Sequence, residues 1–114
     1  MSSCLFCKIA TGKMNADTVY NDDEVVAFRD LNPQAPVHIL IIPVKHISTV
    51  NDIEATDETL IGKLFSTAKL LAQKEGIDEP GYRLVMNCNA QAGQSVFHIH
   101  LHLLGGRSMS WPPG

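Results

Sequence analysis

The sequence predicts an α+β fold, with an antiparallel sheet of about five strands, one main helix and a short helix near the N-terminus. Two observations indicate this: β-favouring segments stand on both sides of a single amphipathic stretch, and proline, glycine or asparagine marks the connections. A chain of 114 residues, 45% of them apolar, is typical of one compact unit. We therefore expect residues 1–114 to form a single domain.

The N-terminal half is expected to hold the short helix and three strands. Residues 4–10 form a helical turn whose apolar side chains share a face. Residues 18–30 form a hairpin, because Asn-Asp-Asp separates two β-favouring runs, and its second strand ends near Asp30. A loop with two prolines follows, and the apolar run over residues 37–44 predicts a buried strand that Pro43 ends.

The C-terminal half begins with the main helix. From Thr56 the apolar residues recur with a helical period, and Gly76 provides a left-handed stop. Two further strands are expected at residues 82–87 and 96–105, with a loop between them. The tail that follows contains two prolines and cannot extend the sheet.

Charge and hydropathy exclude several classes of partner. The net charge of −3 and the pI near 5.9 argue against a broad basic surface for nucleic acid or anionic membranes. The longest apolar run, residues 39–44, is too short to span a bilayer and contains a proline. No export-like apolar stretch follows Met1, so the predicted location is the cytoplasm, where thiols stay reduced.

Three histidines alternate with apolar residues near the C-terminus: His98, His100 and His102. In a strand these side chains would line one face about 6.6 Å apart. A tetrahedral zinc ion needs ligand nitrogens about 3.3 Å apart, so three in a straight row should not chelate one ion. They could instead be a row of surface histidines, but a fourth, His38, lies inside the apolar run. Neutral imidazoles can attack an electrophile or move protons near neutral pH, which favours a catalytic cluster.

A glycine-containing turn enters the same segment. The backbone N–H groups of Gly93, Gln94 and Ser95, with the Ser95 hydroxyl and the Gln94 amide, could hold phosphate oxygens. The turn alone is a weak signal, but an anion binder beside a nucleophile is what a phosphoryl-transfer site requires.

The motif "HIHLHLL" resembles the signature of the histidine triad superfamily. The surrounding stretches "FRDLNPQAPVHILIIPVKHI", "GYRLVMN", "GQSVFHIHLHLLGG" and "WPPG" are similar to the Hint branch of nucleoside phosphoramidases, from about Cys4 to Gly114. The resemblance implies hydrolysis of purine nucleoside 5′-phosphoramidates through a nucleotidyl-histidine, without a catalytic cofactor. The substrate is thus expected to be a purine nucleotide, AMP or GMP joined to an amine.

The resemblance also implies roles for individual residues. His100 attacks phosphorus. His38 orients His100 or shares a proton with it, and His102 contacts the phosphate. Further phosphate-side positions are Ser95, Gln94, Gly93 and Asn87. Asp30 binds the ribose hydroxyls, and four apolar side chains hold the base: Phe6, Ile9, Phe28 and Leu31.

Each of these residues also has an ordinary structural interpretation. Asp30 could cap the turn before the prolines, and Asn87 could be a turn amide at the end of a strand. Phe6, Ile9 and Phe28 could be ordinary core residues.

Cys4 and Cys7 with His46 and His98 resemble a structural zinc set found in some bacterial relatives. Cys4 and Cys7 could equally be buried thiols without a metal. With zinc, His98 is structural; without it, His98 is a hydrogen-bonding partner in the site.

The family resemblance further implies a homodimer whose C-terminal tail reaches the opposite site, with Trp111 shaping the leaving-group side. A loosely docked tail is the alternative. Two other functions stay open from the residues: a nucleotide-binding regulatory module in which hydrolysis is incidental, and a zinc-stabilised interaction domain.

Overall fold

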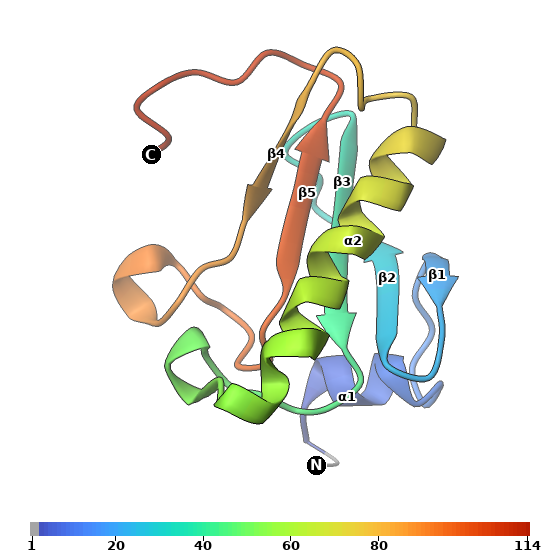
Figure 1. The fold of residues 1–114 in the computed structure, drawn as a ribbon, viewed down its shortest axis with the longest axis vertical. Coiled ribbons are helices and arrows are strands. Elements are labelled where there is room, and N and C mark those ends of the chain that lie inside the picture. The colour runs from blue at the N-terminus through green and yellow to red at the C-terminus, as the bar shows by residue number, and fades with distance from the viewer. Residues whose placement is uncertain (1–2) are drawn as a thin grey trace.

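The computed structural model describes residues 3–114 and confirms the α+β fold with five strands (Figure 1). Its helices and strands follow in chain order as α1 (Leu5–Ala10), β1 (Thr18–Asn21), β2 (Val25–Arg29), β3 (Val37–Pro43), α2 (Glu58–Lys74), β4 (Tyr82–Val85) and β5 (Leu101–Gly105). Between residues 3 and 114, no helix is both long enough and apolar enough to cross a membrane.

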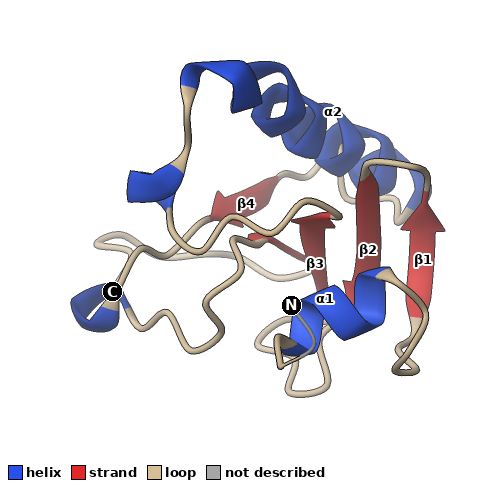
Figure 2. Cartoon of the chain, turned by 90° about the horizontal axis from the view of Figure 1, so that it is seen from below, coloured by secondary structure: helices blue, strands red, loops and turns tan. Residues whose placement is uncertain are grey.

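The sheet has the order β1-β2-β3-β5-β4, and every neighbouring pair is antiparallel. Figure 2 shows α2 on one face of the sheet and α1 on the other. The alternation along β3 explains both contacts: Ile39 and Ile41 belong to the cluster under α2, whereas Leu40 and Ile42 pack with Phe6 of α1. The central strand β3 is thus apolar on both faces because a helix covers each.

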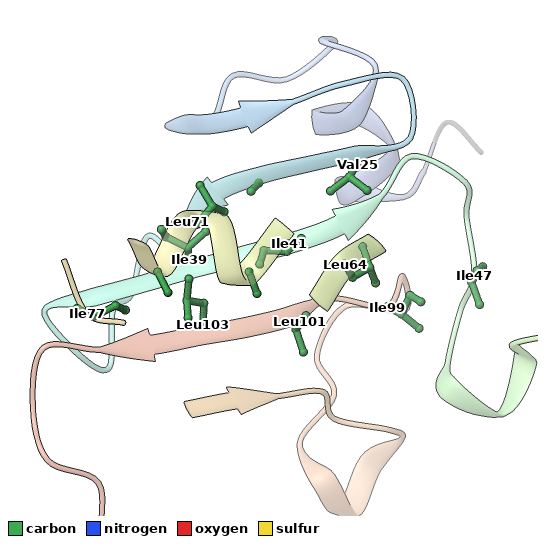
Figure 3. Packing of buried hydrophobic residues seen from close by; sticks show 13 residues of the cluster. Val25, Ile39, Ile41, Ile47, Leu64, Leu71, Ile77, Ile99, Leu101 and Leu103 are labelled. Atoms are coloured by element: carbon green, nitrogen blue, oxygen red, sulfur yellow. The ribbon is translucent and has the colours of Figure 1, made fainter. Parts of the chain in front are cut away.

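The larger core lies between α2 and the sheet (Figure 3). Leu64 and Leu71 of α2 pack against the α2-facing residues of the sheet. Ile99, Leu101 and Leu103 belong to the same cluster, and each is at most 1% exposed. Because they alternate with the three histidines, the histidines are left for the face that α1 covers.

The last strand is shorter than the sequence predicts. Residues 96–100 have no strand structure, and the ladder with β3 begins only at Leu101 opposite Ile41. The backbone N–H of Ile99 donates to the carbonyl oxygen of Ile47 at 2.8 Å, so this segment follows the loop after β3 rather than β3 itself. Consequently His98 and His100 lie ahead of β5, and only His102 lies within it.

Helix α2 begins two residues later than Thr56. The Asp57 carboxylate does not cap it, because its oxygens accept from the Glu54 N–H and pair with Lys45. The helix ends where predicted, with Gly76 at φ +73°, a left-handed conformation that glycine adopts without strain.

Candidate active site

A cavity of about 270 Å³ opens between α1 and the sheet face that carries the histidines. Its wall is mainly apolar. The apolar members include Leu5, Phe6, Ile9, Phe28, Leu31, Leu40 and Val96; the polar ones include Asp30, Ser95, His100 and His102. The structure thus brings together the four residues predicted to hold the base and four of the predicted polar residues, whereas His38, Asn87, Gly93 and Gln94 do not line the cavity. Phe6 and Phe28 are core residues, about 5% exposed, and they also line the cavity.

His100 has its tautomer fixed by the backbone. Its Nδ1 lies 2.8 Å from the carbonyl oxygen of His98, which can only accept, so Nδ1 carries the hydrogen. In the neutral ring Nε2 therefore keeps a lone pair. Burial lowers the pKa of His100, although the hydrogen bond to His98 and the charge of Asp30 oppose the shift. The ring, 6% exposed, is thus a neutral imidazole that borders the cavity.

His38 and His102 form a chain with a defined direction. The backbone N–H of Gln34 donates to Nδ1 of His38 at 3.0 Å, so the neutral ring carries its hydrogen on Nε2. That Nε2 lies 2.9 Å from Nδ1 of His102, which must accept. The remaining hydrogen of His102 is on Nε2, a buried atom with no hydrogen-bond partner among residues 3–114.

Both rings are neutral for the same physical reason. Burial lowers the pKa of His38, and it lowers that of His102 to about 4, with the neighbouring histidines adding to the effect. The hydrogen-bonded pair of His38 and His102 therefore has one unpaired N–H donor, the Nε2–H of His102, and His102 lines the cavity. Such a donor suits an anionic ligand.

Asp30 has two tasks. Its Oδ1 accepts from the backbone N–H of Asn32 at 2.8 Å, which is the turn-capping interpretation. Its Oδ2 lies 3.4 Å from Nε2 of His38, and the residue lines the cavity. The carboxylate is therefore held in place and still accessible to a ligand.

The turn before the triad departs from expectation. The Gly93 N–H donates to Ala90, and the Gln94 N–H donates to Asn89. The side-chain Nε2 of Gln94 donates to the carbonyl oxygens of Ser48 and Val96. Gln94 and Gly93 thus brace the loop, and the expectation that they bind phosphate does not fit these contacts.

The next two residues have backbone donors that the loop does not use. Ser95 and Val96 line the cavity, and within the described chain their backbone N–H groups donate to no other group. Val96 was missed from the sequence because an apolar side chain gives no sign of a useful N–H. Asn87, two residues past the end of β4, is not among the residues that line the cavity.

The predicted metal ligands form a cluster that includes His98, the first histidine of the triad. Nδ1 of His98 lies 3.4 Å from Cys4 Sγ and 3.5 Å from Cys7 Sγ, and Nδ1 of His46 lies 3.3 Å from Cys7 Sγ. Ligand atoms around a tetrahedral zinc ion with such donors stand roughly 3.5 Å apart.

The tautomer of His98 supports a metal in this cluster. Its Nε2 donates to the carbonyl oxygen of Pro43 at 2.7 Å, which leaves the Nδ1 lone pair facing the two thiols. The four ligand atoms lie within 4.8 Å of one another. The residues present therefore fit a Cys₂His₂ zinc ion, with four protein ligands and no open position.

The chain shares its fold and sequence with proteins of known family. The HIT domain family model matches residues 11–109. Purine nucleoside phosphoramidase of Escherichia coli K12 is 53% identical over 105 residues, 92% of this chain and 88% of that protein. A 14 kDa zinc-binding protein of Brassica juncea is 48% identical over 112 residues, 96% of this chain and 98% of that protein.

A solved structure agrees with these relatives. The HIT family hydrolase from Legionella pneumophila superposes with a TM-score of 0.97 at 58% identity, and the match covers 98% of this chain and all of that one. The alternating histidines, their position on the α1 face of the sheet and the match over most of the chain lead to one conclusion: this chain belongs to the HIT domain family.

Proposed function

We propose that the chain hydrolyses purine nucleoside 5′-phosphoramidates and releases the nucleoside monophosphate. The observation that carries this proposal is the His100 ring, whose Nε2 lone pair is available beside an apolar cavity that His102, with its unpaired Nε2–H, also lines. The name of the Escherichia coli relative supports the substrate class.

The reaction takes two steps. The Nε2 lone pair attacks the α-phosphorus, the P–N bond breaks, and the amine leaves with a proton taken from solvent. Water then attacks phosphorus, the P–Nε2 bond breaks, and a proton returns to solvent. The first step leaves a nucleotidyl-imidazolium whose Nδ1–H still donates to the His98 carbonyl, and the second step restores the neutral ring in the same tautomer.

The phosphate oxygens would be held by hydrogen-bond donors. These are the Nε2–H of His102, the Ser95 hydroxyl and the N–H groups of Ser95 and Val96. Their interactions strengthen as negative charge develops on the oxygens. The base would lie in the apolar slot, and the Asp30 carboxylate would accept from the ribose hydroxyls.

The charge of the cavity suits a monoanionic phosphorus centre. Among the described residues that line it, the one cation is Arg29, and Glu75 engages its guanidinium at 2.9 and 3.1 Å. A dianionic phosphomonoester usually requires a free cationic clamp or a metal ion. A nucleoside 5′-phosphoramidate, with one ester bond, one P–N bond and a single negative charge, does not.

We further propose that Cys4, Cys7, His46 and His98 hold a structural zinc ion. Bound there, the ion would neutralise the two thiolates and take no part in the chemistry. Cys4 caps α1, which carries the base slot, and the carbonyl of His98 orients His100. The cluster would therefore join the two sides of the active site.

We also propose a homodimer, acting as one domain per chain in the cytoplasm. The edge strand β4 has a free side for pairing, and Trp111 is 80% exposed in a tail that Arg83 holds through the Ser110 carbonyl. Light scattering of the purified protein would report the oligomeric state directly.

Replacement of His100 by alanine tests the catalytic proposal. We expect turnover of adenosine 5′-phosphoramidate to fall at least about 1,000-fold, because the covalent step is lost. AMP binding should change much less, and it serves as the control for folding. Turnover that stays near the wild-type rate would contradict the mechanism.

A further inference from the structure

Cys4 and Cys7 are two thiols that lie close enough to react with each other. Their sulfur atoms and the ligand nitrogens of His46 and His98 all lie within 4.8 Å of one another. The backbone N–H of Cys7 donates to Cys4 Sγ at 3.4 Å, so the first sulfur already faces the residue that carries the second. Cys-X-X-Cys pairs at the start of a helix form reversible disulfides in redox proteins.

An oxidant can reach this cluster from solvent. Cys4 and His46 border a surface groove of about 490 Å³, and His46 is exposed. Cys4 and Cys7 are half-buried, whereas His98 is fully buried. A small neutral oxidant such as hydrogen peroxide therefore meets Cys4 Sγ with a second thiol beside it. An accessible thiol next to a resolving cysteine is typical of a redox-sensing site.

The oxidation needs one peroxide and no other reagent. One thiolate sulfur attacks a peroxide oxygen, the O–O bond breaks, and a sulfenic acid and a hydroxide ion form. The second thiolate attacks the sulfenic sulfur, the S–S bond forms and a second hydroxide leaves. The two sulfurs thus give two electrons to the peroxide, and two protons from solvent convert both hydroxides to water. Because only a thiolate is a metal ligand, the disulfide leaves His46 and His98 alone, too few to hold zinc.

Two contacts join the cluster to the catalytic ring. The carbonyl oxygen of His98 accepts from Nδ1–H of His100 at 2.8 Å, which fixes the tautomer of His100. Phe6 lies between the two cysteines in the sequence, and its ring packs edge-on against the rings of His98 and His100, with centroids 6.0 and 5.0 Å apart. Phe6 also lines the nucleotide cavity. A change in the bonding of the two sulfurs and of His98 therefore reaches both the catalytic ring and the apolar wall.

We propose that Cys4 and Cys7 are a peroxide-sensitive pair whose oxidation to a disulfide releases the zinc ion and weakens nucleotide binding. The inference rests on the zinc ion proposed above and makes its ligands a modification site. A dithiol reductant would cleave the disulfide, and returning zinc would restore the site. Coupling between two sites commonly changes affinity 5- to 150-fold, so we expect oxidation to raise the Kd for AMP at least about 5-fold.

The test treats zinc-loaded protein with hydrogen peroxide and measures three quantities. A chromogenic chelator reports released zinc, peptide mass spectrometry without reduction locates disulfides, and titration calorimetry gives the Kd for AMP. Wild type should release about one zinc ion per chain, contain a disulfide between Cys4 and Cys7, and bind AMP at least about 5-fold more weakly. Dithiothreitol with added zinc should reverse all three changes.

Two controls separate this pair from other oxidation. Cys88→Ser is the matched variant, because Cys88 is the third free thiol and does not belong to the cluster; it should respond as wild type does. Met14 lines the nucleotide cavity and is 41% exposed, so its oxidation would also weaken AMP binding. Methionine sulfoxide requires dedicated reductases, so recovery with dithiothreitol assigns the effect to the disulfide.

Three results would overturn the inference. These are a disulfide that forms while zinc stays bound, a Kd for AMP that is unchanged after zinc is released, and oxidation of Cys88 while Cys4 and Cys7 stay reduced. Oxidised protein without a cooperative thermal transition would also overturn it, because oxidation would then unfold the whole chain. Purified protein without zinc would contradict the proposed zinc site, and this inference with it. Hydrolysis is judged separately, from turnover by untreated protein and its loss in His100→Ala.

Discussion

Replacing His102 by phenylalanine should make the free protein more stable while it weakens nucleotide binding. The His102 Nε2–H is a buried donor without a partner in the described chain, and such a group costs about 1–3 kcal/mol of stability. Phenylalanine removes it, and the cavity beside the ring leaves room for the larger side chain.

The change also removes the acceptor for the His38 Nε2–H, at a cost of about 0.5–1.5 kcal/mol. The Asp30 Oδ2 at 3.4 Å can accept this hydrogen instead. The net gain is therefore about 1 kcal/mol, which for a chain of this size raises Tm by about 4 °C. Most substitutions of half-buried residues lower Tm, so the sign is informative.

The cost appears in ligand binding. A hydrogen bond to a charged phosphate oxygen contributes about 1.5–3 kcal/mol, so the Kd for AMP should rise roughly 10- to 150-fold. Calorimetric unfolding without ligand and titration calorimetry with AMP measure the two effects. A Tm below that of wild type, or an unchanged Kd for AMP, would refute the reasoning.

Two predictions concern protons and one concerns the metal. Burial lowers the pKa of His100, so the acid limb of kcat/KM should have its midpoint below 6.5; a midpoint at or above 6.5 would contradict a buried neutral nucleophile. The pKa of His102 is lowered to about 4, whereas in the unfolded chain a histidine titrates near 6.5. The unfolded state then binds more protons between these values, and the free energy of unfolding should fall as pH drops from about 6.5 to 4, measured by urea titration. Protein grown with zinc should contain about one ion per chain by elemental analysis. Chelation should then lower Tm and speed hydrogen exchange in α1, and Cys7→Ser should contain no zinc; full zinc content in that variant would argue against the cluster.

Much of the fold follows from periodicity. Ile99, Leu101 and Leu103, which alternate with the histidines in the sequence, all lie in the cluster under α2, even though residues 96–100 do not join the ladder. Side-chain alternation reports the burial of faces, whereas strand pairing depends on where a partner backbone lies. The sequence carries no sign that Ile99 bonds to Ile47 instead of β3.

The site was predictable in its residue types but not in its hydrogen-bond directions. His100 and His102 both line the cavity, but His38 is hydrogen-bonded to His102 and not, as expected, to His100 among the described residues. Their tautomers depend on the backbone atoms of Gln34 and His98, and backbone atoms are the same for every residue. The turn residues illustrate the same limit.

Gln94 has the amide chemistry for phosphate, but its donors are used by the carbonyl oxygens of Ser48 and Val96. Which groups remain free is decided by the folded backbone around them. Val96 shows the opposite: its side chain is apolar, but its backbone N–H donates to no other group in the described chain and lies at the cavity.

The central claim is that Nε2 of His100 forms a bond to phosphorus during turnover. Its most direct test is mass spectrometry of protein mixed with adenosine 5′-phosphoramidate and quenched without acid. Peptide fragmentation should locate one adenylyl group on His100 and none on His102 or His38. Continued turnover with no adenylated peptide, or with the group on another residue, would contradict the claim.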